Sequence, residues 1–276
     1  MSLDPRITPA RGDIAAAHLR GRVEAKRFVE GDVRIVTSGR VALRAGPAAN
    51  AGMASELLFG ERVAVYDRSD GFAWVQAERD SYMGYVREHA LGEMFEPTHR
   101  ITALMTPLLP APDVKRPALD MLPLNACVQV VGREGRFACV APRGFVSESH
   151  LAPVDTKQSD WIAVAERFIG VPYIWGGKTA AGLDCSGLVQ IVLEAADIAC
   201  PRDSDMQQNA LGEAVSKTQL QRGDLVFWNG HVGIMRDAQV LLHANAFFMD
   251  VTSEPLETAA ARIAKSAGPI TVVKRL

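Results

Sequence analysis

The sequence predicts a multi-domain protein in which two small all-β barrels precede one α+β domain. Short apolar segments with the period of a strand fill residues 31–155, whereas helical and strand patterns mix over residues 156–276. A chain of 276 residues is also long for one domain, because domains usually hold about 100 to 200 residues. We therefore expect an N-terminal helical extension over residues 1–30, a first barrel over 31–95, a second barrel over 96–155 and the α+β domain over 156–276.

The expected extension and the first barrel differ in their period. Residues 14–29 place Ala15, Leu19, Val23 and Phe28 among charged residues at near-helical spacing, which predicts a helix. The strands expected after it are residues 33–36, 41–44, 62–66, 73–77 and 84–86. Short strands in close succession, separated by turns that contain Gly, Pro or Asp, are typical of a small barrel.

Part of this plan recurs in residues 96–155. The strands expected there are residues 101–104, 127–131, 137–140 and 144–146. Residues 84–91 and 144–151 share the order Gly, aromatic, Val, any residue and Glu, and both segments then reach His and Leu. This weak internal repeat resembles the closing strand of bacterial SH3-like domains, and the two barrels together resemble a tandem pair of them.

Composition argues against several classes of function. The chain has 30 basic and 32 acidic residues and a net charge of −2, so we expect no nucleic-acid partner and no polybasic membrane patch. Charges interrupt the first 22 positions and no later apolar run could span a bilayer, so we expect no signal peptide, no membrane partner and a cytoplasmic location. The four cysteines form no C-x-x-C pair, so we expect no disulfide framework and no zinc knuckle. We also expect no metal and no cofactor.

The α+β domain begins after a polar stretch without periodicity, residues 153–160. Helical patterns occupy residues 161–169, 186–196 and 256–267. Strand patterns occupy residues 224–228, 231–235, 240–244 and 270–274. Helices and strands mixed in this way predict a sheet covered by helices.

Cys185 stands between a turn at residues 180–182 and the apolar helix that starts near Ser186. At a helix N-terminus, unpaired backbone N–H groups and the positive end of the helix dipole favour the thiolate, which is the nucleophilic form. The same N–H groups can bind an oxyanion. The alternative for this cysteine alone, as for the other three, is a buried core thiol.

Two histidines strengthen the case for chemistry. A three-residue loop after Met235 would pair that residue with Gln239 and His231 with His243. Directly opposed residues share a face with Cβ atoms roughly 5 Å apart, so one imidazole could act as the base and the other could orient it. A register different by one residue would put them on opposite faces. Cys185, His231 and His243 are therefore a candidate triad, with two structural histidines as the alternative.

Four motifs follow one another in this part of the chain. They are Pro172-Tyr173-x-Trp175-Gly176-Gly177, Asp184-Cys185-Ser186-Gly187-Leu188, Gly223-Asp224-Leu225-Val226-Phe227 and His231-Val232-Gly233-Ile234. Together they resemble the NlpC-type cysteine peptidases, which are papain-like cell-wall hydrolases. The resemblance covers residues 160–276 and implies a papain-like fold with Cys185 as nucleophile, His231 as base and His243 as the third triad member. It also implies that Tyr173 helps to stabilise the oxyanion. The residues implied to line the substrate site are Asp184, Ser186 and Trp175.

The whole arrangement, two SH3-like domains before the peptidase, resembles γ-D-glutamyl-L-diamino acid endopeptidases. These enzymes cut after D-Glu in peptides that begin with free L-Ala. In that subgroup an Arg-Asp-Ser segment binds the substrate end, and Arg202-Asp203-Ser204 stands at that place. A carboxylate is a fitting partner for the ammonium group of L-Ala, although a solvated helix cap is the alternative for this segment. The resemblance also implies that a Tyr and a Glu of the first barrel close the amine pocket, for which Tyr82 and either Glu56 or Glu61 are candidates.

We therefore expect a cysteine endopeptidase that acts on murein-derived peptides, in cytoplasmic recycling rather than in remodelling of the intact wall. The alternatives are a papain-like amidase or acyltransferase, and a murein-binding protein whose catalytic domain is inactive.

Overall fold

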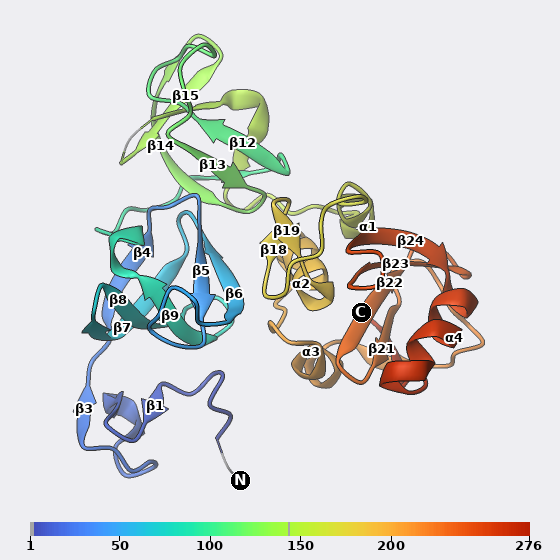
Figure 1. Cartoon of the computed structure of the whole chain (residues 1–276). Helices are drawn as coiled ribbons and strands as arrows, with labels where there is room; N and C mark the ends of the chain where they lie inside the picture. Colours follow the sequence, from blue (N-terminus) through green and yellow to red (C-terminus); the bar gives the residue numbers. More distant parts are fainter. Residues whose placement is uncertain (1–2, 143) are drawn as a thin grey trace. The chain divides into compact units, whose positions relative to one another are not determined.

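The computed structural model describes residues 3–142 and 144–276, and the chain divides into two compact units, residues 1–156 and 157–276. Figure 1 follows both units along the chain, from blue to red. The division lies one residue after the start that the sequence predicts for the α+β domain.

The N-terminal segment forms a small sheet instead of the expected helix. Its strands are β1 (Ala10–Arg11), β2 (Ile14–Ala16) and β3 (Arg27–Val29), with a 3-10 turn, η1 (Ala17–Leu19), after β2. The prediction of a helix over residues 14–29 was wrong because all of β2 is buried, whereas a surface helix buries one stripe. Gly21, at a φ of 80°, also lies outside helical geometry. Ile14 packs with Trp74 and Met83, which joins the segment to the first barrel.

Seven strands form the sheet of the first barrel. They are β4 (Asp32–Val36), β5 (Arg40–Arg44), β6 (Met53–Leu58), β7 (Arg62–Ser69), β8 (Phe72–Ala77), β9 (Met83–Arg87) and β10 (Leu91–Gly92). Their order in the sheet is β10-β4-β7-β8-β9-β5-β6. Val63 and Val65 of β7 are buried, and Val65 lies opposite the buried Val75 of β8. Alternate residues of these strands therefore face the core, as expected for a barrel wall.

The second β unit holds a five-stranded sheet and a separate hairpin. The sheet order is β16 (Phe145–Ser147), β15 (Phe137–Ala141), β14 (Cys127–Glu134), β11 (His99–Ile101) and β17 (Leu151–Pro153), and the hairpin pairs β12 (Met105–Leu108) with β13 (Asp120–Pro123). The repeat seen in the sequence has a structural counterpart. In both places a strand leads through a 3-10 turn, η2 (Glu88–Ala90) or η3 (Glu148–His150), into a short closing strand, β10 or β17.

A six-stranded antiparallel sheet forms the centre of the second compact unit. Its order is β20 (Glu213–Val215), β25 (Val272–Arg275), β21 (Leu225–Trp228), β22 (His231–Met235), β23 (Val240–Asn245) and β24 (Asp250–Pro255). A small hairpin of β18 (Lys178–Thr179) and β19 (Gly182–Leu183) lies apart from it. The sequence predicted the four strands β21, β22, β23 and β25 but not β20 or β24.

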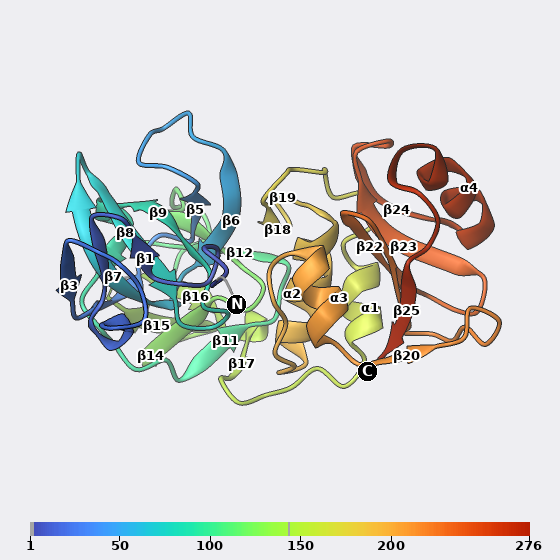
Figure 2. The same ribbon diagram turned by 90° about the horizontal axis from the view of Figure 1, so that it is seen from below.

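Helices cover both faces of this sheet. α1 (Trp161–Glu166), α2 (Cys185–Ala195) and α3 (Ser204–Ala210) lie on one side, and α4 (Leu256–Ala267) lies on the other (Figure 2). Every residue of α2 is buried, so this helix runs through the interior, as its apolar sequence requires. None of the described helices combines the length and apolar character needed to cross a membrane.

Candidate active site

Cys185 is the first residue of α2, one position before the predicted start. Asp184 caps the helix: its backbone is extended, and its Oδ1 accepts a hydrogen bond of 2.7 Å from the Gly187 N–H. The cap holds the thiol at the end of the helix where backbone N–H groups have no partner within the helix. These donors can serve an oxyanion that forms next to the sulfur.

Asp184 also belongs to a buried network with Arg202 and Ser186. Arg202 Nη2 donates to Asp184 Oδ2 at 2.7 Å, and Arg202 Nη1 donates to Ser186 Oγ at 2.8 Å. Arg202 is 1% exposed, and a buried charge is tolerated only when it is paired and hydrogen-bonded. These bonds favour a role in supporting the start of α2. Contact of Asp184, Ser186 and Arg202 with substrate stays a prediction.

Burial raises the pKa of the Cys185 thiol to about 12, and the Asp184 carboxylate adds to the rise. Hydrogen bonds from the Val232 and Ser186 N–H groups act in the opposite direction but do not outweigh it. The thiolate expected from the sequence took the helix N-terminus into account but not the burial of the side chain, which raises the pKa. The resting group is therefore a thiol, and a base must take its proton during the reaction.

His231 and His243 meet, but in a register that differs from the predicted one. Met235 pairs with Leu241 rather than with Gln239, a shift of two residues. Because side chains alternate with a period of two, this shift leaves both histidines on the same face. They meet on a diagonal, with 2.8 Å between His231 Nε2 and His243 Nδ1. The predicted direct pairing was wrong, whereas the shared face is confirmed.

A carboxylate that sequence reasoning missed continues this line of side chains. His243 Nε2 lies 2.9 Å from Glu254 Oε1, and Arg262 Nη1 donates to Glu254 Oε2 at 2.7 Å. Arg262 Nη2 also donates to Glu254 Oε1, so the ion pair is bidentate. Residues 250–255 had no predicted strand, because Val251 is their one aliphatic residue and they show no apolar alternation.

Burial lowers the pKa of His231 to about 3, and the charges of His243 and Arg262 act in the same direction, against that of Glu254. Burial likewise lowers the pKa of His243. Although burial opposes ionisation of Glu254, hydrogen bonds from Arg262 and His243 hold its pKa below the ordinary value. At neutral pH the two imidazoles are therefore neutral and the carboxylate is charged.

One cavity of about 250 Å³ brings the reactive groups together. Its lining includes Tyr173, Cys185, His231, Asn245 and Arg262. Burial raises the pKa of the Tyr173 phenol, and the charges of Cys185 and Asp184 add to the rise. The phenol thus keeps its proton and can donate a hydrogen bond to an oxyanion beside Cys185.

Three further predicted residues lie in the second unit. Trp175 is 72% exposed. Asp203 occupies the N-cap position of α3 without a side-chain capping hydrogen bond, and Ser204 is the first residue of that helix. The Asp203 side chain therefore does not cap the helix. Its contact with substrate stays a prediction. In residues 3–142 and 144–276, no group of three or more His, Cys, Asp or Glu could hold a metal ion.

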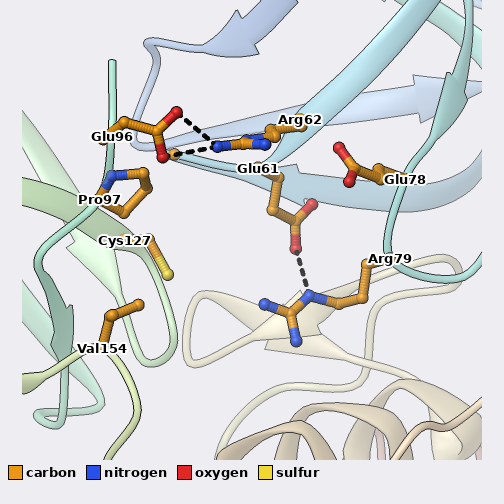
Figure 3. A pocket seen from close by; sticks show the side chains of 9 residues that line it. Glu61, Arg62, Glu78, Arg79, Glu96, Pro97, Cys127 and Val154 are labelled. Carbon is orange, nitrogen blue, oxygen red and sulfur yellow. Dashed lines mark hydrogen bonds and ion pairs between the residues drawn. The ribbon is translucent and has the colours of Figure 1, made fainter. Parts of the chain in front are cut away.

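The remaining candidates lie in the first unit. Tyr82 is 6% exposed and Glu56 is 1% exposed, with Arg40 as an ion-pair partner of Glu56. Glu61 lines a cavity of about 440 Å³, where its carboxylate points toward Arg79 with 3.8 Å between Oε1 and Nε (Figure 3). Their part in an amine pocket stays a prediction.

Comparison with known proteins gives this geometry a family context. Residues 170–262 match the NlpC/P60 family, and residues 43–91 match the bacterial dipeptidyl-peptidase Sh3 domain. A gamma-D-glutamyl-L-lysine dipeptidyl-peptidase of Bacillus subtilis is 27% identical over 220 residues, which is 69% of this chain and 71% of that protein. A protein of the same name from Bacillus cereus is 44% identical over 69 residues, which is 25% of this chain and only 20% of that relative.

The fold has a solved counterpart. An NlpC/P60 family protein from Bacillus cereus has a TM-score of 0.76 to this chain at 20% identity, over 88% of this chain and 99% of that one. A likeness at this level of identity concerns the fold. From the two matched segments, the chain carries an NlpC/P60 peptidase domain preceded by a bacterial dipeptidyl-peptidase SH3 domain.

Proposed function

We propose that the chain is a cysteine endopeptidase that cleaves the bond between γ-D-Glu and a diamino acid in murein peptides with a free N-terminal L-Ala. The observation that carries this proposal is the placement of Cys185 at the start of α2, in one cavity with a His231 that is hydrogen-bonded to His243. The names of the two Bacillus relatives support the choice of bond.

The chemistry is acyl transfer in two steps. The Cys185 sulfur attacks the γ-carbonyl carbon of D-Glu as its proton passes to His231, and the Tyr173 phenol and N–H groups at the start of α2 bind the oxyanion. His231 then gives the proton to the leaving amine, which leaves a thioester. Water that loses a proton to His231 hydrolyses this thioester, releases the dipeptide and restores the thiol.

Mass spectrometry of the products from L-Ala-γ-D-Glu-diaminopimelate tests the activity. The wild-type chain should release L-Ala-D-Glu and diaminopimelate, and Cys185→Ala should release neither while keeping the melting temperature. Cys139→Ala, a change of the same kind in the second β unit, is the matched control and should leave turnover unchanged. Hydrolysis by Cys185→Ala at the wild-type rate would overturn the assignment.

The amine pocket is the second part of this proposal. The Asp203 carboxylate, at the N-terminus of α3, would pair with the ammonium group of L-Ala, since a charge-assisted contact separates a free amine from an acylated one. N-acetyl-L-Ala-γ-D-Glu-diaminopimelate should therefore be cut at least about 10-fold more slowly than the free peptide, because a hydrogen bond to a charged group is worth about 1.5–3 kcal/mol. Equal rates would remove this role for Asp203.

Two rival functions would give other results. Turnover of acyl-ester donors without cleavage of the peptide would indicate an amidase or acyltransferase at the same site. Binding of the peptide without cleavage above the level of Cys185→Ala, and without turnover of acyl-ester donors, would indicate a binding protein with an inactive catalytic domain.

We further propose that the enzyme acts in the cytoplasm on released murein peptides. A substrate with a free L-Ala amine has already been detached from its sugar strand, so such an enzyme would act after the wall has been cut rather than on the intact wall. Cell fractionation followed by the same mass-spectrometric assay tests the location, and activity found only outside the cytoplasm would contradict it.

A further inference from the structure

One face of the sheet in the second unit carries a continuous line of polar side chains. It runs from His231 on β22 through His243 on β23 to Glu254 on β24, and Arg262 of α4 closes it. Leu241 pairs with Glu254, so Glu254 and His243 lie on the same face at diagonal positions. His243 is 0% exposed and Glu254 is 8% exposed, which keeps water from replacing either partner.

The hydrogen bonds along this line leave one arrangement of protons. An ionised carboxylate only accepts, so the proton between Glu254 and His243 must sit on His243 Nε2. A neutral His243 then has its lone pair on Nδ1, which must accept the proton that His231 Nε2 donates. A neutral His231 in turn has its lone pair on Nδ1, which is the atom able to take a proton.

We propose that Glu254 is a positioning residue that sets the tautomers of both histidines and thereby makes His231 Nδ1 the base. The proposal deepens the proposed function, because it names the atom that takes the Cys185 proton. Arg262 donates to both oxygens of Glu254 and so keeps that carboxylate charged and acceptor-only. Without the carboxylate, His243 can carry its proton on Nδ1, and His231 would then be protonated on Nδ1 and unable to act.

Two substitutions separate the acceptor from the charge. In Glu254→Gln, the carbonyl oxygen can take the place of Oε1, which accepts from both His243 and Arg262, while the amide replaces Oε2. The amide cannot accept the hydrogen bond from Arg262 Nη1, so the charge and that bond are lost. The acceptor for His243 Nε2 remains and the tautomers persist, so kcat should fall about 10-fold or less. Glu254→Leu removes the acceptor, and kcat should fall about 100-fold or more with KM unchanged, because a positioned general base contributes typically 10²–10⁴-fold.

Asp224 offers a matched control for damage to the fold. It is also buried and pairs in a bidentate way with an arginine, with Arg275 Nε donating to Oδ1 at 2.7 Å and Arg275 Nη2 donating to Oδ2 at 2.8 Å. No histidine takes part in that pair. Asp224→Asn and Asp224→Leu should lower the melting temperature as the Glu254 variants do but leave kcat within about 2-fold. A kcat that follows the melting temperature equally in both series would reduce Glu254 to a structural residue and overturn the proposal.

Histidine-selective ¹⁵N NMR reads the tautomers without substrate. In the wild-type chain both His231 and His243 should show protonated Nε2 and unprotonated Nδ1. In Glu254→Leu, part of the population should carry the proton on Nδ1 of each ring instead, which shifts both ¹⁵N signals of that ring. The charged groups that act on these rings are Glu254, Arg262 and Asp250, so the spectra are compared at one pH for all variants. Protonated Nδ1 on His231 of the wild type would overturn the proposal even if the peptidase activity is confirmed. The expected tautomers in a chain that cleaves no peptide would uphold it and refute the proposed function instead.

Discussion

At the scale of single residues, the ionisation of His231 determines how activity should respond to acid. Catalysis requires the neutral imidazole, and burial, together with the charges of His243 and Arg262, lowers the pKa of His231 to about 3. Because the pKa is lowered, the base stays unprotonated well below pH 6.5, the ordinary value for histidine. We expect kcat/KM to stay within about 2-fold between pH 7 and pH 5.

A pH profile of peptide hydrolysis at substrate concentrations below KM measures this directly, because it reports groups of the free enzyme. Circular dichroism at each pH separates loss of fold from loss of the base. An acid limb near pH 6.5 in a folded protein would show that His231 titrates as an ordinary histidine.

Gly233 is a second position at which a single added carbon atom should change the activity. It lies on β22, two residues from His231, and a Cβ there would stand 2.7 Å from Leu241 Cδ1 and 3.2 Å from His243 Cβ. Gly233→Ala should push His243 away from His231, and kcat should fall about 10-fold or more, since displacements of about 1 Å can cost 10²-fold. Steady-state kinetics measure the loss.

The control for this change is Gly132→Ala, where the new Cβ would make an ordinary contact of 3.8 Å with the Cβ of Cys139. That variant should keep full activity. An unchanged kcat in Gly233→Ala would show that the Leu241 side chain gives way to the new Cβ and that the contact between His231 and His243 persists.

At the scale of elements, the two aspartates whose side chains cap helices of the second unit differ in what depends on them. Asp160 caps α1 by accepting from the Ala163 N–H at 2.9 Å, and it is exposed, as is its ion pair with Arg222. Because an exposed ion pair adds little, Asp160→Ala should lower the free energy of unfolding by about 1 kcal/mol. Asp184 caps α2 and also pairs with the buried Arg202. Asp184→Ala leaves that guanidinium without its carboxylate and should cost about 3–5 kcal/mol.

Urea unfolding of the two variants, followed by circular dichroism, measures both losses. The m-value must match that of the wild type for the comparison to hold. Equal losses in the two variants would show that Arg202 finds another acceptor when Asp184 is removed.

Elements with a strong local signal could be predicted from the sequence, and those that depend on distant contacts could not. The helix of Cys185 and the strand that begins at His231 lie within one residue of their predicted bounds, because continuous apolar runs bounded by turn residues identify them. The β22–β23 register was wrong by two residues because five residues, not the assumed three, separate Met235 from its partner Leu241. Glu254 was missed because only the folded sheet brings β24 beside His243.

The helix predicted over residues 14–29 is absent for a related reason. Its alanines suit a helix, and intrinsic preference is a weak prior that tertiary packing overrides. Here the first barrel supplies Trp74 and Met83 as partners for Ile14, and strand pairing wins. The carboxylate–histidine line could likewise have been proposed only from the fold, since its four members come from four elements.

At the scale of the whole molecule, the first unit is predicted to contribute to substrate choice. The resemblance assigns Tyr82 and one of Glu56 and Glu61 to the recognition of the free amine. If one glutamate takes this role, its change to Gln should lower kcat/KM for the free peptide about 10-fold or more and leave the rate on the N-acetyl peptide unchanged. The physical reason is that a charge-assisted hydrogen bond, worth about 1.5–3 kcal/mol, is lost only when the substrate carries the ammonium group.

The measurement is the ratio of kcat/KM for the free and N-acetyl peptides in Glu56→Gln, Glu61→Gln and Tyr82→Phe of the full chain. Glu78→Gln is the matched control, because Glu78 is exposed and lines the same cavity as Glu61. Dividing by the rate on the N-acetyl peptide cancels any general loss of folded protein, which matters because Glu56 and Glu61 are both buried. If all three variants keep the wild-type ratio, the second unit alone selects the free amine. Asp203 would then be the residue that makes this selection.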